Sequence, residues 1–141
     1  MLRQALYRMD RTGDCLRAPR QRSTMNRQQF ESIVHAVLQE LPVWVREALD
    51  NIEILVEETP DPELDPEGSG LLGIYLGTPL PQRGVHYAWA LPDVIYIFRQ
   101  PHLDLNLPDD ELRQEIARTV MHEIAHYFGI DDDHLDEIGW G

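Results

Sequence analysis

Two histidines near the end of the chain have the spacing of metal ligands. His122 and His126 are four residues apart, and in a helix this spacing places them about 40° apart around the axis and one turn apart along it. Two imidazoles in this arrangement can bind one ion, and zinc takes nitrogen ligands at about 2.0–2.1 Å. The spacing therefore predicts a metal centre, provided that the surrounding residues form a helix.

The glutamate next to the first histidine adds an acid–base group. On a helical wheel Glu123 lies beyond His126, so its carboxylate can reach a water molecule on the metal without being a ligand itself. A zinc ion lowers the pKa of such a water toward about 7. A carboxylate placed there can take the proton as the water attacks a carbonyl carbon, and can then pass it to the leaving amine. Glu123 is therefore the predicted general base.

A third ligand must come from the residues that follow. Gly129, three residues after His126, suits a helix end with a left-handed cap that reverses the chain. The candidate side chains beyond it are those of Asp131, Asp132, Asp133, His134 and Asp136. The short link from the reversal back to the ion fits Asp132 best. His134 is the alternative, because imidazole suits zinc well but would need a wider loop. An acid left over could accept the outer N–H group of a ligating histidine.

The helix that carries the two histidines is predicted to start after Pro108 and to end before Gly129. Asp109 is the expected N-cap, with Asp110 and Glu111 in the first turn. Its apolar arc comprises Leu112, Ile116, Ala117, Val120, Met121, Ile124, Tyr127 and Phe128. The polar stripe opposite would more often be only a solvated face. The glycine at the helix end and the acids beyond it favour the metal site here.

Ahead of this helix the pattern predicts helices first and strands afterwards. Apolar residues at helical spacing predict a helix around residues 30–38, followed by a short helix over 43–49. Strands are predicted over residues 52–58, 71–77, 85–91 and 93–101. A loop rich in proline and glycine occupies 59–70, and a connection occupies 102–108. This order predicts an α+β domain with a small mixed sheet packed on helices.

The charge of the chain is distributed unevenly. All twelve basic residues are arginines, and the net charge is −13. Residues 1–22 carry six arginines against two aspartates, a net charge of +4, whereas residues 23–141 carry six arginines against 23 acids, a net charge of −17. A domain this acidic should repel nucleic acid and anionic membrane surfaces.

The change in composition near Met25 divides the chain into two predicted parts. Residues 1–24 are expected to form a basic N-terminal extension, either a flexible arm or the result of a start assigned too early, and residues 25–141 a single domain. One cysteine, Cys15, excludes an internal disulfide. No apolar run has membrane-spanning length, and the first residues lack the apolar core of a signal peptide. The predicted location is the cytoplasm.

The segment HEIAHYFGIDD resembles the active-site helix of the zincins. It follows the metzincin arrangement HExxHxxGxxH, with Asp132 at the position of the third ligand. This aspartate variant in a short chain is similar to the small bacterial zincin-like metallopeptidases, often called minimal metallopeptidases. The segments FESIVHAVLQELP, IEILVEETP and GLLGIYLGTPL also resemble the framework of that family. The resemblance covers about residues 25–141.

The resemblance implies a zincin-like fold and one zinc ion. By position, His122, His126 and Asp132 would be the metal ligands, Glu123 the general base and acid, and Gly129 the turn below the metal. Zincins also hold an extended peptide along an edge strand. In this chain that strand would be formed by Gly73, Ile74 and Tyr75.

Two parts of the family's pattern have no clear counterpart. Metzincins place a methionine-containing turn below the metal, but this chain has no methionine after Met121, so the floor must come from residues such as Leu135, Ile138 and Trp140. A residue that stabilises the transition state is not evident either. Tyr127 and His86 are candidates by residue type, although Tyr127 lies on the apolar arc and is expected in the core.

Three functions are consistent with these patterns. The first is a zinc-dependent metallopeptidase that acts on peptide or protein substrates. The second is a metal-dependent ribonuclease-like hydrolase, against which Glu123 and the charge of residues 23–141 argue. The third is a non-catalytic, metal-containing module that binds peptides.

Overall fold

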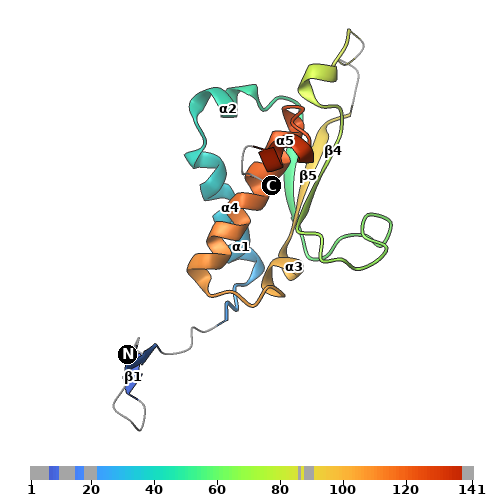
Figure 1. The fold of residues 1–141 in the computed structure, drawn as a ribbon. Coiled ribbons are helices and arrows are strands. Elements are labelled where there is room, and N and C mark those ends of the chain that lie inside the picture. Colours follow the sequence, from blue (N-terminus) through green and yellow to red (C-terminus); the bar gives the residue numbers. More distant parts are fainter. Residues whose placement is uncertain (1–6, 10–14, 18–21, 86, 88–90, 138–141) are drawn as a thin grey trace.

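The computed structural model describes residues 7–9, 15–17, 22–85, 87 and 91–137, except for the side chains of 7–9, 15–17 and 136 (Figure 1). The helices are α1 (Arg27–Glu40), α2 (Val43–Ala48), α3 (Arg99–Leu103), α4 (Asp109–Tyr127) and α5 (Asp132–Glu137), with a 3₁₀ turn, η1 (Leu80–Gln82). The strands are β1 (Tyr7–Met9), β2 (Cys15–Arg17), β3 (Ile52–Glu57), β4 (Gly73–Leu76) and β5 (Asp93–Phe98). Strands β1 and β2 form a separate antiparallel pair.

The remaining strands form one mixed sheet. Their order is β3-β5-β4, with β3 parallel and β4 antiparallel to β5, so β4 lies at an edge. Figure 1 shows α1 and α4 on the same side of this sheet, and α4 packs on α1, β4 and β5. The predicted α+β class, with a small mixed sheet on helices, is confirmed.

The core lies between the sheet and the two long helices. Alternate residues of β5 point into it, and Ile95 and Ile97 are fully buried. The expected apolar arc of α4 faces them, since Leu112, Ile116 and Val120 are at most 1% exposed. Burial of such side chains contributes about 1.5–3 kcal/mol each, which holds α4 rigidly against the sheet. Within the ranges that the structure describes, no helix has the length and hydropathy needed to cross a membrane.

The two ends of α4 follow from local residues. The prediction of Asp109 as N-cap is wrong by one position, because Pro108 is the N-cap and Asp109 opens the first turn. Three acidic residues in this turn still stabilise the helix, because their negative charges lie at the positive end of the helix dipole. The prediction for Gly129 is confirmed: its φ is 85°, and the N–H of Ile130 donates to the carbonyl of Ala125 at 3.0 Å. This hydrogen bond belongs to a Schellman motif, which turns the chain back after the helix.

Other predicted elements need correction. The strand expected over residues 85–91 is wrong at Val85, Tyr87 and Leu91, which belong to no strand, and its remaining residues lie outside the described ranges. Helices α3 and α5 were not predicted, because five or six residues are too few to show a helical period. Asp131 starts α5 by accepting a hydrogen bond from the backbone N–H of His134 at 2.9 Å.

A buried histidine joins α3 to α4. His102 is 0% exposed, and its Nδ1 donates to the carbonyl oxygen of Phe98 at 2.6 Å. Its Nε2 lies 2.9 Å from the hydroxyl of Thr119, and the ring of Phe30 packs edge-on at 5.3 Å. Burial lowers the pKa of His102 below its ordinary value of 6.5. Burial therefore favours the neutral ring in the folded protein at neutral pH, with its proton on Nδ1.

This burial predicts a pH-dependent stability. Below about pH 6.5 the unfolded chain takes up a proton at His102, whereas the folded chain resists this protonation. The contribution of His102 to the unfolding free energy is therefore complete above that pH and is lost as the pH falls. Replacement by asparagine keeps a donor for the Phe98 carbonyl but removes the titration. The drop in unfolding free energy between about pH 7.5 and about pH 5.5, measured with denaturant, should be smaller in His102→Asn than in the wild type. An equal drop in both proteins would contradict the prediction.

Candidate metal centre

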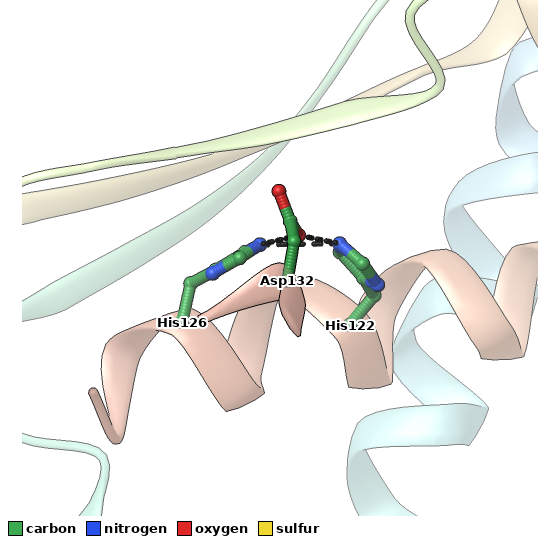
Figure 2. A group of neighbouring side chains, drawn as sticks. All are labelled: His122, His126 and Asp132. Atoms are coloured by element: carbon green, nitrogen blue, oxygen red, sulfur yellow. Dashed lines mark hydrogen bonds and ion pairs between the residues drawn. The ribbon is translucent and has the colours of Figure 1, made fainter. Parts of the chain in front are cut away.

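Three side chains converge at the C-terminal half of α4 (Figure 2). The Nε2 atoms of His122 and His126 are 3.1 Å apart. Each of them lies 3.2 Å from the same carboxylate oxygen of Asp132. Figure 2 shows both imidazoles pointing toward each other, with the carboxylate between them. These three atoms therefore surround a single point.

The separations suit zinc. Ligand atoms about 2.0–2.2 Å from a tetrahedral zinc lie about 3.3–3.6 Å from one another. The observed distances of 3.1 and 3.2 Å fall just below this range, so a small outward shift would admit the ion. Two imidazole nitrogens and one carboxylate oxygen are also ligands that zinc prefers. Among the residues that the structure describes, the donor set thus fits zinc and leaves a fourth position open.

The turn after α4 is what brings the third side chain to the histidines. Gly129 has a positive φ of 85°, and a Cβ there would lie 2.8 Å from Pro81. Only glycine fits this position without strain. The turn delivers Asp132 as the first residue of α5, while the carboxylate of Asp131 points to the helix backbone as its cap.

The alternative third ligand lies elsewhere. His134 is on α5 with its side chain 58% exposed, and its Nδ1 is 3.6 Å from a carboxylate oxygen of Glu137. Among the described residues, the group that could hold a metal contains Asp132 and not His134. The Asp136 side chain lies outside the described part of the chain.

The predicted general base is buried beside this group. Glu123 is only 7% exposed, and burial raises the pKa of its carboxyl group. The nearby imidazoles of His126 and His122 and the backbone N–H of Tyr75 oppose this rise. A carboxylate with raised proton affinity next to an open metal position can accept a proton from water.

A cleft opens over the candidate metal ligands. It has a volume of about 460 Å³, and a second cavity of about 260 Å³ shares Gly73, His122 and Glu123 with it. All three residues predicted to bind substrate, Gly73, Ile74 and Tyr75, line the larger cavity. Its wall also contains residues without any predicted role, namely Leu71, Pro79, Gln82 and Ile130. No spacing in the sequence relates these residues to the histidines.

Strand β4 lies at the edge of the sheet and lines the cleft, and the backbone N–H of Tyr75 donates to the carboxylate of Glu123. The carbonyl of Leu72 accepts from the N–H of Phe98 at 2.9 Å. Hydrogen-bonded positions alternate along an antiparallel pair, so the peptide groups of Gly73 and Tyr75 face away from β5. Figure 2 shows this strand, in yellow-green, passing over the three side chains. A peptide in the cleft could therefore pair with it.

Gly73 allows the strand to lie this close to the helix. A Cβ at this position would be 2.7 Å from the Thr119 methyl group, 3.0 Å from the Tyr96 carbonyl oxygen and 3.4 Å from Cγ of Glu123. Real Cβ atoms do not approach this closely, so a larger residue would have to push β4 away from α4. The same contact places the strand beside Glu123.

Gly73→Ala is therefore expected to destabilise the fold by about 1–3 kcal/mol through overpacking. Thr119→Ser removes the methyl group at 2.7 Å but keeps the hydroxyl near His102. The double variant should recover part of the loss, which a double-mutant cycle of unfolding free energies would measure. Additive effects of the two substitutions would contradict the proposed contact.

The remaining candidates are the residues predicted to stabilise the transition state and those predicted to form the floor of the site. Tyr127 is fully buried, and its hydroxyl donates to the carbonyl of Ala48 at 2.7 Å, so the expectation that it belongs to the core is confirmed. Leu135 is also fully buried. His86, Ile138 and Trp140 lie outside the described residues.

Known proteins resemble this chain in sequence and in fold. A family model described as "Zincin-like metallopeptidase" matches residues 49–140, which is more than half of the chain. A solved structure, a conserved hypothetical protein from Thermus thermophilus, is similar in fold with a TM-score of 0.50 and 22% identity. That match covers 81% of this chain and 97% of the other. No match is found among curated proteins. The extent of the family match shows that the chain belongs to the zincin-like metallopeptidase family.

Proposed function

We propose that this protein is a zinc-dependent metallopeptidase that hydrolyses peptide bonds. The observation that carries the proposal is the convergence of His122, His126 and Asp132 at separations of 3.1–3.2 Å beside the buried carboxyl group of Glu123. A structural zinc site would have four protein ligands and no acid–base group at an open position. Here three ligands, an open position and a carboxylate occur together.

Each residue has a defined part in the proposed reaction. His122, His126 and Asp132 would hold one zinc ion, which when bound supplies Lewis-acid activation of water and of the scissile carbonyl group. Glu123 takes the proton of the attacking water and returns it to the leaving amine.

The position of β4 at the edge of the sheet supports a peptide as the substrate. The carbonyl groups of Gly73 and Tyr75 and the N–H of Gly73 point away from β5 in a strand that lines the cleft, and an extended chain can pair with such an edge through its backbone. Nucleic acid is disfavoured, because residues 23–141 carry a net charge of −17. An unfolded peptide segment can pair with the edge strand, and it lacks the phosphate charges that this domain would repel.

Metal analysis and a cleavage screen test the proposal together. The purified protein should contain about one zinc per chain, and it should cleave members of a library of unstructured peptides. A chelator should abolish the cleavage, and added zinc should restore it. Absence of bound metal after zinc supplementation would reject the proposed centre. Metal and peptide binding without cleavage would instead indicate a binding module, and cleavage of RNA in parallel reactions would indicate a ribonuclease.

A further inference from the structure

A buried ion pair lies behind the wall of the cleft. The guanidinium of Arg83 donates to the carboxylate of Asp93 at 2.8 Å, and the two side chains are only 7% and 3% exposed. Removal of two charges from water costs several kcal/mol per ion unless their hydrogen bonds are well satisfied. Neither residue belongs to the candidate metal centre, so this arrangement needs a separate explanation.

The carboxylate of Asp93 accepts hydrogen bonds from three residues within the segment 75–83. Besides Arg83, the hydroxyl of Tyr75 donates to it, and so does the backbone N–H of Thr78 at 3.2 Å. Gly77 permits this wrapping, because a Cβ there would collide with the carboxylate carbon of Asp93. The end of β4 and the turn after it are thus folded around a single side chain at the start of β5.

Arg83 is fixed on every side. Its Nε donates to the carbonyl of Thr78 at 3.1 Å, and its Nη1 donates to the carbonyl of Asp50 at 3.0 Å. The guanidinium also lies between two aromatic rings, 4.0 Å from the centroid of Tyr87 and 4.9 Å from that of Tyr127. A planar, forked group can make all these contacts at once, whereas a lysine ammonium cannot.

The segment held in this way forms part of the cleft. Pro79 and Gln82, at the two ends of the turn that contains η1, line the larger cavity. Pro81, between them, contacts Gly129. A Cβ atom on Gly129 would lie 2.8 Å from the ring of Pro81. Gly129 begins the turn that leads to Asp132, so the turn at residues 79–82 supports the chain on its way to the third candidate ligand.

We propose that Arg83 is a positioning residue, which with Asp93 and Tyr75 holds residues 79–82 as the cleft wall and buttresses the Gly129 turn that carries Asp132. The part of this inference that concerns substrate binding rests on the proposed peptidase function. The part that concerns the position of Asp132 does not. Pro79 and Gln82 line the same cleft as Ile130 and Asp131, so the wall that they form limits the space available to a substrate.

Arg83→Lys and Arg83→Met test this inference against a matched control. Ile33→Ala removes a core side chain on α1 that is 6% exposed and lines neither cavity, so it lowers stability without touching the cleft. All variants are compared at a temperature at which denaturation curves show them fully folded. Cobalt(II) is titrated into metal-free protein, because its visible spectrum reports ligand geometry independently of catalysis. Steady-state cleavage of one responsive peptide is measured in parallel.

Both arginine variants are expected to bind cobalt about tenfold to 100-fold more weakly with a shifted spectrum, and to show a raised KM, whereas Ile33→Ala keeps the wild-type values. Folded Arg83 variants with wild-type cobalt spectra, affinities and KM would overturn the inference. If Arg83→Met does not fold, Arg83→Lys decides, because it keeps the buried charge. If the wild type cleaves no peptide, the proposed function fails, and the cobalt titrations still decide the role of Arg83.

Discussion

Replacement of Glu123 by glutamine is expected to leave the metal bound and to lower kcat/KM for peptide hydrolysis by about 100-fold to 10,000-fold. Glutamine has nearly the same shape but cannot take a proton from water. The side chain is 7% exposed, and burial raises the pKa of the carboxyl group, so removal of its charge should not destabilise the fold. Zinc content, unfolding free energy and steady-state kinetics of Glu123→Gln separate these three effects.

A second glutamate on α4 provides a matched control for this prediction. Glu115 lines the smaller cavity, and its carboxylate lies 3.9 Å from the guanidinium of Arg118 instead of facing the candidate metal ligands. Glu115→Gln should therefore keep kcat/KM within about threefold of the wild type, as expected for loss of a weak surface ion pair. Equal activity of Glu123→Gln and the wild type would show that Glu123 is not the general base.

The second large effect is expected at the third ligand. Asp132→Ala should weaken zinc binding by more than about 100-fold, beyond the loss typical for residues that only support a ligand. Peptide cleavage should disappear with the metal. Its carboxylate oxygen is 3.2 Å from both imidazole nitrogens, and no other described carboxylate joins this group. Zinc affinity is measured by competition with a chromophoric chelator.

Two neighbours on α5 make this test specific. Asp133 follows Asp132 in the same first turn of the helix, so Asp133→Ala changes the charge at the helix terminus in the same way but should retain zinc. His134→Ala should also retain zinc, because its ring pairs with Glu137. Loss of zinc in His134→Ala, with retention in Asp132→Ala, would reverse the assignment of the third ligand.

Much of the fold could be predicted from local patterns. The apolar arc of α4 and the alternation in β3 depend on side chains within one element, so helical and strand periods reveal them directly. The role of Gly129 as the helix cap was predictable for the same reason, because the positive φ is required by the end of the helix that it follows. Helix α5 was missed, because its start depends on the cap at Asp131 and on burial of Leu135 by other elements.

The segment at residues 85–91 shows where local patterns fail. Its apolar and aromatic residues favour a strand, but hydrogen-bonded partners on a neighbouring strand decide whether one forms. In the structure β4 already occupies the edge beside β5, and Tyr87 instead packs on the guanidinium of Arg83. This contact depends on the position of Arg83, which is fixed by an ion pair with Asp93 on β5.

The sequence by itself determined the local half of the candidate site. A four-residue interval on a helix brings His122 and His126 together whatever surrounds that helix, and Glu123 follows by the same geometry. The tertiary structure decided that Asp132 meets them while His134 lies near Glu137, and that Glu123 is buried, which raises the pKa of its carboxyl group. It also decided that Arg83 holds the cleft wall. These outcomes depend on how separate elements pack, and packing is set by contacts between residues that are distant in the sequence.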